Sequence, residues 1–482
     1  MNIRLYNTAS RKKVKFHPLK EGRAGIYVCG VTVYDLCHIG HARSVIFFDT
    51  LVRYFRARGL EVTYVRNFTD VDDKIIERAC QQGRPPETLA QEYIDSFHED
   101  MERLGVLRAD REPRATEHIQ DMIHMIKVLI DKDFAYVREA DVFYSVEKFK
   151  DYGKLSGRRL EDMKAGSRIA VDRRKKHPMD FTLWKGAKPG EPQWDSPWGP
   201  GRPGWHMECS VMSNYFLGPT FDIHGGGKDL LFPHHENERA QSMAANDAEF
   251  ARYWVHNGFV TVESEKMSKS LGNFIAIRDA LKDYSPEVLR LFLLSKHYRS
   301  PLDYSKREVN TLQTGLVRVY RTLQRMAALI GSYEEQGESS LPWPDTDREF
   351  LGKFMDIMDD DLNTAGALGL LFEEVKDMNR LMDMHEEKQD ENILERLRAD
   401  RSALYRAARV LGILKEKPED FLRKTGRPVD IDQGDIERMM GERADARAGR
   451  DWARADAIRE KLREMGVILE DGPQGTRWRW EV

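Results

Sequence analysis

The feature that most constrains the fold is a strand–helix–strand pattern near the start of the chain. Residues 25–30 (GIYVCG) form a short apolar run that ends in glycine, which is typical of a buried strand. Apolar residues then recur at near-helical spacing over residues 41–59, and residues 61–65 alternate as a second strand. Such a unit closes with a right-handed crossover in a parallel sheet. The pattern therefore predicts an α/β domain.

Changes in composition and periodicity divide the rest of the chain into regions. At roughly 100–200 residues per domain, 482 residues predict about three or four domains. Proline and glycine become dense before residue 204, which indicates an insertion, and from about Pro286 the pattern is almost entirely helical. Residues 415–433 resemble a linker, and a small helical domain is expected after them. We predict these divisions: 1–133 and 204–262 as the two halves of the α/β domain, 134–203 as the insertion, 263–305 as a connecting region, 306–415 as a helical bundle, and 416–482 as the linker and terminal domain.

Composition excludes several classes of protein. The net charge of −4 argues against a protein that coats nucleic acid non-specifically, although a local basic stripe is enough to bind tRNA. We find no membrane span, because no apolar run approaches the ~18–20 residues that one needs. The first twenty residues lack the apolar core of a secretory signal. Four cysteines in a chain of this kind fit a reducing cytoplasm better than a disulfide framework. A monomer is expected, since no long exposed apolar helix suggests a dimer interface.

The first candidate motif is Cys37-His38-Ile39-Gly40-His41, between the first strand and its helix. Open parallel sheets bind ligands at this end of their strands, and the helix N-terminus is expected to offer free N–H groups to phosphate. Gly40 would let a nucleotide approach the backbone, and His38 and His41 would donate hydrogen bonds to phosphate oxygens. Taken alone, such a histidine pair fits a structural role equally well.

The second motif is Lys266-Met267-Ser268-Lys269-Ser270. Two lysines in a small-residue loop suit a mobile clamp on a polyphosphate, although a short Lys/Ser stretch is usually just a solvated loop. The two motifs, in this order on an alternating fold, resemble the H-I-G-H and K-M-S-K-S signatures of the class I aminoacyl-tRNA synthetases. The resemblance implies a Rossmann-like catalytic domain with an insertion, a helical bundle and a C-terminal anticodon-binding domain. It also implies ATP with Mg²⁺, bound by Lys269 with help from Lys266, His38, Gly40 and His41.

A candidate metal site comprises Cys29, Cys209, His234 and Glu238. His234 and Glu238 are four residues apart, so on a helix they share one face. Two thiolates, an imidazole and a carboxylate suit zinc, but the spacing does not identify the set, and on the residues alone both cysteines fit buried core thiols better than metal ligands. The tandem histidines do not form the H-E-x-x-H motif of zinc proteases, because Arg239 stands in place of its second histidine.

Three segments around these residues resemble the cysteinyl-tRNA synthetases: 30–34 (GVTVY), 202–210 (RPGWHMECS) and 221–238 (FDIHGGGKDLLFPHHENE). The resemblance spans essentially the whole chain. It implies that the four donors bind one zinc ion and that the substrate L-cysteine completes the coordination of this ion through its sulfur. It implies formation of cysteinyl-adenylate from ATP and transfer of cysteine to the terminal adenosine of tRNA(Cys). The pocket residues that it implies are Gly30, Thr69, Trp205, His224 and Asp229.

Chemical selectivity supports a metal in this role. Serine is nearly isosteric with cysteine, and a hydrophobic pocket separates such pairs by only roughly 10²-fold. Zinc prefers a thiolate to a hydroxyl, so no separate editing domain is expected. A mycothiol-pathway ligase, which joins cysteine to an amino sugar, is an alternative with the same core. The C-terminal residues ending in DGPQGTRWRW favour tRNA, since that family normally lacks the terminal domain. Intact signatures disfavour a catalytically silent binding module.

Overall fold

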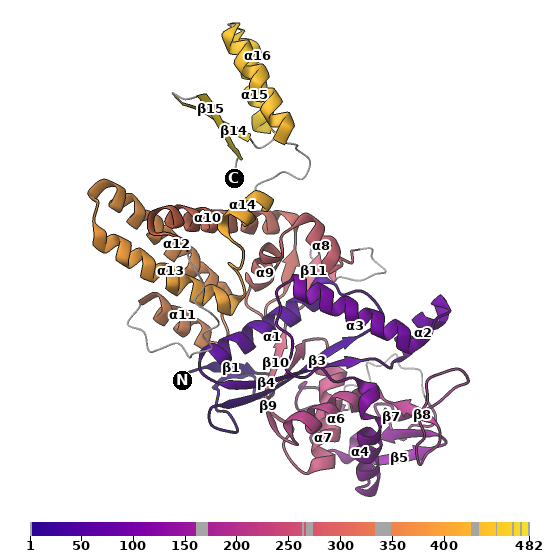
Figure 1. The fold of residues 1–482 in the computed structure, drawn as a ribbon. Coiled ribbons are helices and arrows are strands. Elements are labelled where there is room, and N and C mark those ends of the chain that lie inside the picture. Colours follow the sequence, from indigo (N-terminus) through magenta and orange to yellow (C-terminus); the bar gives the residue numbers. More distant parts are fainter. Residues whose placement is uncertain are drawn as a thin grey trace.

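The computed structural model describes most of the chain as a set of well-defined elements (Figure 1). Its described residues are 2–160, 172–262, 265–266, 273–332, 349–425, 433–449, 451–464, 467–472 and 475–480. Lys269 therefore lies outside the described residues, and for Lys266 the backbone alone is described.

The centre of the molecule is a four-stranded parallel sheet, and it confirms the predicted α/β class. Its strand order is β10 (Ala251–Asn257), β9 (Phe221–Gly227), β3 (Arg23–Thr32) and β4 (Glu61–Thr69). Helix α1 (Ile39–Ala57) connects β3 to β4, which is the neighbour of β3 on one side. After β9, the neighbour of β3 on the other side, the chain continues outward to β10. The boundary between β3 and β9 is thus the topological switch point, where folds of this kind bind ligands.

A second, antiparallel sheet lies within the expected insertion. Its strands, in spatial order, are β5 (Ala135–Arg138), β6 (Asp141–Tyr144), β7 (Phe181–Gly186) and β8 (Gly201–Pro203). Buried aromatic side chains such as Tyr144, Phe181 and Trp184 pack it into the same core as α4 (Ile119–Asp131) and α6 (Trp205–Leu217). The other elements of this half are β1 (Arg4–Asn7), β2 (Lys12–Lys15), α2 (Asp73–Gln82), α3 (Pro86–Arg103), η1 (Ala115–His118), η2 (Val146–Lys148), η3 (Leu231–His235) and α7 (Glu236–Asn246).

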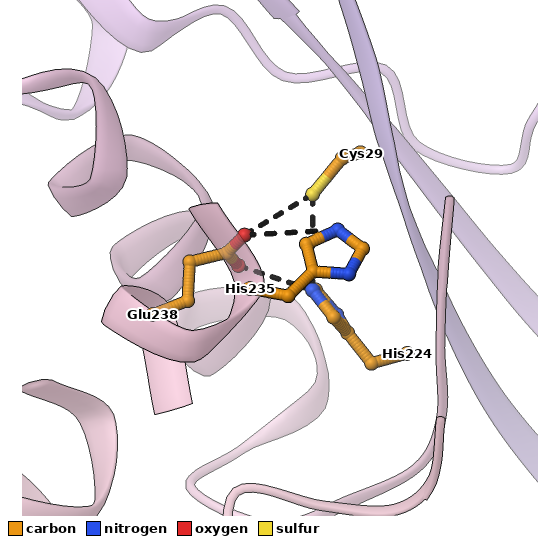
Figure 2. A group of neighbouring side chains, drawn as sticks. All are labelled: Cys29, His224, His235 and Glu238. Carbon is orange, nitrogen blue, oxygen red and sulfur yellow. Dashed lines mark hydrogen bonds and ion pairs between the residues drawn. The ribbon is translucent and has the colours of Figure 1, made fainter. Parts of the chain in front are cut away.

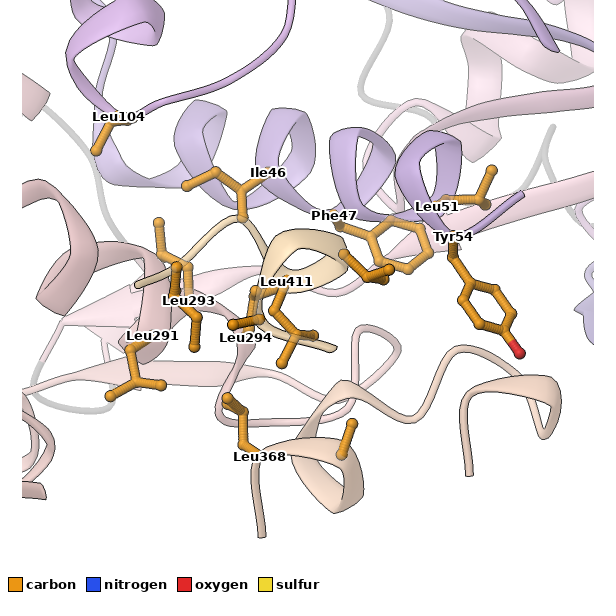
Figure 3. Close-up of a cluster of buried hydrophobic side chains, with 14 of the residues drawn as sticks. Ile46, Phe47, Leu51, Tyr54, Leu104, Leu291, Leu293, Leu294, Leu368 and Leu411 are labelled. Atoms are coloured by element: carbon orange, nitrogen blue, oxygen red, sulfur yellow. The ribbon is translucent and has the colours of Figure 1, made fainter. Parts of the chain in front are cut away.

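The following region is mostly helical and shares a core with α1. Its elements are β11 (Val260–Val262), β12 (Glu265–Lys266), α8 (Ile277–Asp283), α9 (Pro286–Leu294), β13 (Leu302–Tyr304), α10 (Lys306–Ile330), α11 (Glu349–Asp359), α12 (Thr364–Lys388) and α13 (Glu391–Leu411). Figure 3 shows Ile46 and Phe47 of α1 facing Leu294, Leu368 and Leu411. The α/β domain and the bundle are therefore joined by one continuous hydrophobic core rather than by a flexible linker.

The C-terminal region differs from the sequence-based expectation in two ways. Part of the predicted linker forms α14 (Pro418–Thr425), because its Phe421 ring is fully buried and anchors the helix. The terminal domain has the predicted helices, α15 (Gln433–Ala448) and α16 (Trp452–Glu464), but they are followed by an antiparallel hairpin that was not predicted. Its strands are β14 (Val467–Gly472) and β15 (Gly475–Trp480).

The hairpin follows from alternation of its side chains. Val467 and Leu469 are buried against Ile436 and Leu462, one residue in two, which is the period of a strand with one covered face. In Figure 1 this small domain lies apart from the bundle, beyond α14. None of the helices that the structure describes combines the length and the apolar character needed to cross a membrane.

Candidate metal centre and nucleotide cleft

Four predicted donor side chains meet beside the switch point. One ligand atom from each of Cys29, Cys209, His234 and Glu238 lies within 4.8 Å of every other. Cys29 Sγ is 3.6 Å from His234 Nε2 and 3.4 Å from Glu238 Oε1, and these last two atoms are 2.9 Å apart. We call these four residues the thiol cluster.

Each donor comes from a different part of the fold. Cys29 lies in the carboxyl-terminal half of β3, and Cys209 is buried on α6. Helix α7 begins only at Glu236, so His234 sits in the preceding turn, η3, yet it still meets Glu238 as the four-residue spacing predicts. Tertiary packing therefore assembles a donor set that no local sequence motif contains.

The electrostatics of the cluster favour a bound cation. Burial opposes ionisation of Cys209, but hydrogen bonds with Cys29 and His234 outweigh it and lower the Cys209 pKa to about 6. Burial raises the pKa of Cys29 well above its usual value. Burial also opposes the charge on His234, yet the Glu238 carboxylate raises its pKa to about 10, and His234 with His224 holds the Glu238 pKa well below normal. The lowered pKa values of Cys209 and Glu238 favour their anionic forms, which are the forms that bind a cation.

A second donor set overlaps the first. Cys29, His224, His235 and Glu238 also bring one ligand atom each within 4.8 Å of the others. Figure 2 shows these four side chains converging. His224 Nε2 lies 3.1 Å from Glu238 Oε2 and 3.7 Å from Cys29 Sγ, and the side chain is fully buried. His224, which the resemblance places in the substrate pocket, therefore lies against the thiol cluster itself.

Sequence reasoning missed the residues that orient the cluster. His206 Nδ1 lies 2.9 Å from His234 Nδ1, and burial keeps the His206 pKa well below normal, so a neutral His206 accepts from His234. This directs His234 Nε2 toward the cluster. His235 Nδ1 is paired with His256 Nε2 at 2.8 Å, and His256 Nδ1 with Thr8 Oγ1 at 2.8 Å. Among these residues only His206 could have been noticed in the sequence, because it lies three residues before the predicted ligand Cys209.

The predicted pocket residues occupy different positions around the cluster. Trp205 is 37 % exposed and its ring stacks on His234, with centroids 4.1 Å apart. At Gly30 a Cβ would lie 1.6 Å from the Asn67 carbonyl oxygen, so only glycine fits. The Thr69 hydroxyl donates to Glu208 at 2.6 Å and is buried. Asp229 is exposed in the turn after β9.

The first signature caps α1 with its own histidines. The Gly40 and His41 N–H groups donate to His38 Nδ1 at 3.0 and 3.3 Å, and the His38 N–H donates to His41 Nδ1 at 3.2 Å. The two rings stack at 3.7 Å. The prediction of free N–H groups at this helix N-terminus is wrong in this structure, because imidazole nitrogens accept from the first turn. A neutral ring whose Nδ1 accepts carries its proton on Nε2.

The segment after the second signature packs on the first. The Ile39 N–H donates to the Ile275 carbonyl at 3.1 Å, and the Ile277 N–H donates to the Cys37 carbonyl at 3.0 Å. The Phe274 ring meets the His38 ring edge-on at 5.2 Å. Lys266 ends β12, which pairs with β11, and Lys269 lies outside the described residues. The described segment that follows the second signature therefore lies against the first signature.

Three family models match successive parts of the chain. A model described as tRNA synthetases class I (C) catalytic domain matches residues 15–314. A DALR domain matches residues 353–415, and a cysteinyl-tRNA ligase anticodon binding domain matches residues 433–479.

Curated relatives and solved structures agree with these matches. The chain is 52 % identical to a cysteine–tRNA ligase of Syntrophobacter fumaroxidans, over 99 % of this chain and 100 % of the relative. It is likewise 52 % identical to that of Trichlorobacter lovleyi, with the same coverage. A methionyl-tRNA synthetase of Mycobacterium tuberculosis, solved with methionyl-adenylate, has the same fold at 17 % identity, with a TM-score of 0.60 over 84 % of this chain and 94 % of that one. The chain therefore belongs to the cysteine–tRNA ligase family of class I aminoacyl-tRNA synthetases.

Proposed function

We propose that this enzyme activates L-cysteine with ATP, transfers it to tRNA(Cys), and selects cysteine by binding the substrate thiol to a zinc ion held by the thiol cluster. The observation that carries the proposal is the meeting of two thiols, an imidazole and a carboxylate at the switch point. Full-length relatives named cysteine–tRNA ligase, 48–52 % identical to this chain, support the reaction.

The donor set fits zinc in kind and in spacing. Tetrahedral zinc with bonds of about 2.0–2.3 Å places its ligand atoms about 3.3–3.8 Å apart. The 3.6 and 3.4 Å distances from Cys29 Sγ already lie in this range, and the 2.9 Å His234–Glu238 pair needs to open only slightly. Bound zinc would supply a Lewis acid that takes a thiolate in preference to a hydroxyl.

The chain's own residues would hold the rest of the amino acid. Trp205, stacked on His234 and partly exposed, would wall the pocket beside the metal. Asp229, exposed at the carboxyl end of β9, would pair with the substrate ammonium group. Gly30, Thr69 and His224 would line the inner wall, where Thr69 and His224 are already held by Glu208 and Glu238.

ATP would bind at the first signature, against which the segment after the second signature packs. With each Nδ1 engaged in capping, His38 and His41 would donate from Nε2 to the phosphates, and Gly40 would leave room for the nucleotide. Lys266 and Lys269, with Mg²⁺, would stabilise charge on the phosphates as the cysteine carboxylate attacks the α-phosphorus. A ribose hydroxyl of tRNA would then attack the adenylate carbonyl, so no protein nucleophile is required.

The later domains would hold tRNA. The terminal domain matches the anticodon-binding model, which favours tRNA over the amino sugar of the mycothiol-pathway alternative. Within it, Trp478 is partly buried against the small core, so it stabilises the hairpin as well as offering an aromatic edge. We propose a cytoplasmic monomer with the domain division predicted from the sequence.

The decisive experiment measures metal content and substrate choice together. We expect about one zinc per chain in the purified enzyme, and cysteine-dependent pyrophosphate exchange that exceeds the serine-dependent rate by at least about 10⁴-fold. Removal of zinc with a chelator should abolish the exchange, and added zinc should restore it. Labelled cysteine should appear on tRNA(Cys) and not on the amino sugar. An active enzyme without zinc, or one that accepts serine as readily, would overturn the proposal.

A further inference from the structure

Helix α9 carries two buried charged side chains that take no part in the site. Residues 287–294 are all buried, and among them Glu287 is 5 % and Arg290 0 % exposed. Burying a charge is costly unless it is paired and fully hydrogen-bonded. The partners of these two side chains therefore show what the helix holds together.

Arg290 ties helix α1 to the end of the bundle. Its guanidinium contacts the Asp49 carboxylate of α1, and its Nε donates to the Leu411 carbonyl at 2.6 Å. Asp49 is also held by Arg53 Nε at 2.8 Å, on the same helix. Since α1 begins at the first signature, Arg290 connects that helix directly to the last turn of α13.

Glu287 holds the chain that follows α13. One oxygen accepts from the Leu414 N–H at 2.9 Å and from the Tyr320 hydroxyl at 2.8 Å. The other accepts from the Lys415 N–H at 2.7 Å and the Glu416 N–H at 3.3 Å. Three consecutive N–H groups thus point at one carboxylate. Leu414 adopts a positive φ of 58°, a conformation that costs energy in a non-glycine residue and that these bonds hold in place.

The same contacts reach the last helix before the terminal domain. The Tyr320 ring stacks on Phe421 of α14, with centroids 3.9 Å apart and planes 16° apart. Tyr320 therefore touches Glu287 with its hydroxyl and α14 with its ring. We call Glu287, Arg290 and the main chain of residues 411–416 the α9 anchor. It fixes the direction in which the chain leaves the bundle toward the terminal domain.

We propose that Glu287 is a positioning residue for the tRNA-dependent step: through residues 414–416 and α14 it sets where the anticodon-binding domain stands relative to the adenylate site. This inference rests on the proposed function. Cysteine activation uses residues around β3, β9 and α1 and does not need the terminal domain in place. Charging of tRNA needs both ends of the molecule at a fixed separation, so a shift at the anchor penalises it selectively.

The test compares two reactions in Glu287→Gln. An amide has one acceptor oxygen and would aim its own N–H groups at donors of the anchor. We expect kcat/KM for tRNA in aminoacylation to fall about tenfold, with cysteine-dependent pyrophosphate exchange within about twofold of wild type. Tyr320→Phe, which keeps the stacked ring and loses the hydroxyl, should give the same split at about threefold, and it carries the test if Glu287→Gln does not fold.

Asp222→Asn is the matched control. Asp222 is 4 % exposed and accepts from the Leu19 and Gly25 N–H groups at 2.7 and 2.8 Å, wholly within the catalytic domain. Any loss in this variant should affect both reactions in parallel. A parallel loss in the Glu287 and Tyr320 variants, or unchanged charging of tRNA, would overturn the inference. If wild-type enzyme itself fails to charge tRNA with cysteine, the proposed function fails instead.

Discussion

The thiol cluster and the α9 anchor are both groups of polar side chains inside the protein, but they differ in their hydrogen-bond partners. In the anchor, Glu287 and Arg290 are bound mainly by main-chain N–H and carbonyl groups, which cannot move without moving the fold. In the thiol cluster, Cys29, His234 and Glu238 have chiefly one another as partners. Hydrogen bonds to main-chain groups fix the path of the chain, whereas side chains that converge on one point are arranged to bind a ligand.

This difference predicts opposite responses to mutation. Changes in the cluster should alter what the enzyme binds while leaving the fold in place. Changes in the anchor should alter stability and geometry while leaving the cluster's chemistry in place. The largest effect is expected in the cluster, because it contains the proposed contact with the substrate sulfur.

Cys209→Ser should break the cluster's function. Changes in the surroundings of a metal site typically cost 10–100-fold in affinity, so loss of a thiolate ligand should raise the KM for cysteine by at least about 100-fold. The KM for ATP should stay within about threefold, because the nucleotide is proposed to bind at the signatures. Zinc content by metal analysis and the two KM values in pyrophosphate exchange measure this.

His235→Asn is the matched variant from the overlapping donor set. If the thiol cluster holds the metal, this variant keeps its zinc, since His235 belongs to the overlapping donor set and not to the thiol cluster. The reverse pattern, with zinc lost in His235→Asn and kept in Cys209→Ser, would assign the metal to the set containing His224 and His235.

Gly412→Ala should damage the anchor and not the cluster. Gly412 has a φ of +70°, and a Cβ there would lie 2.4 Å from the fully buried Arg290 guanidinium. The left-handed backbone and the overpacking together should lower the free energy of unfolding by about 3 kcal/mol. Urea denaturation measures this loss, and zinc content should be unchanged.

Gly83→Ala isolates the backbone part of that effect. Gly83 has a similar φ of +62°, but no atom lies within 4 Å of the position of its Cβ. The expected loss is about 1 kcal/mol, from the left-handed conformation alone. Equal losses in the two variants would mean that Arg290 yields easily and that the anchor is not closely packed.

Local patterns made much of the architecture predictable from sequence. The parallel sheet and its crossover helix follow from periodicity within residues 25–65. The meeting of His234 and Glu238 follows from their spacing, although the turn before α7 replaces regular helix there. The terminal hairpin was missed because its alternation is short and its arginines obscure it, and α14 because a single buried residue, Phe421, anchors it.

Contacts between distant residues were not predictable in the same way. The bond from Arg290 to the Leu411 carbonyl joins residues 121 positions apart, and nothing in either local sequence indicates it. The capping role of His38 was also missed, since imidazole seldom serves as a cap and the motif suggested phosphate binding. Family resemblance located the donors of the thiol cluster, but the orienting contact of His206 with His234 emerged only from the structure.

X-ray absorption at the zinc edge would test most directly whether the metal binds the substrate's sulfur. The spectrum of the purified enzyme should fit two sulfur ligands with one nitrogen and one oxygen. Saturating cysteine should add a sulfur to the coordination shell, and saturating serine should leave the shell unchanged. A sulfur count that stays constant when cysteine binds would contradict the account.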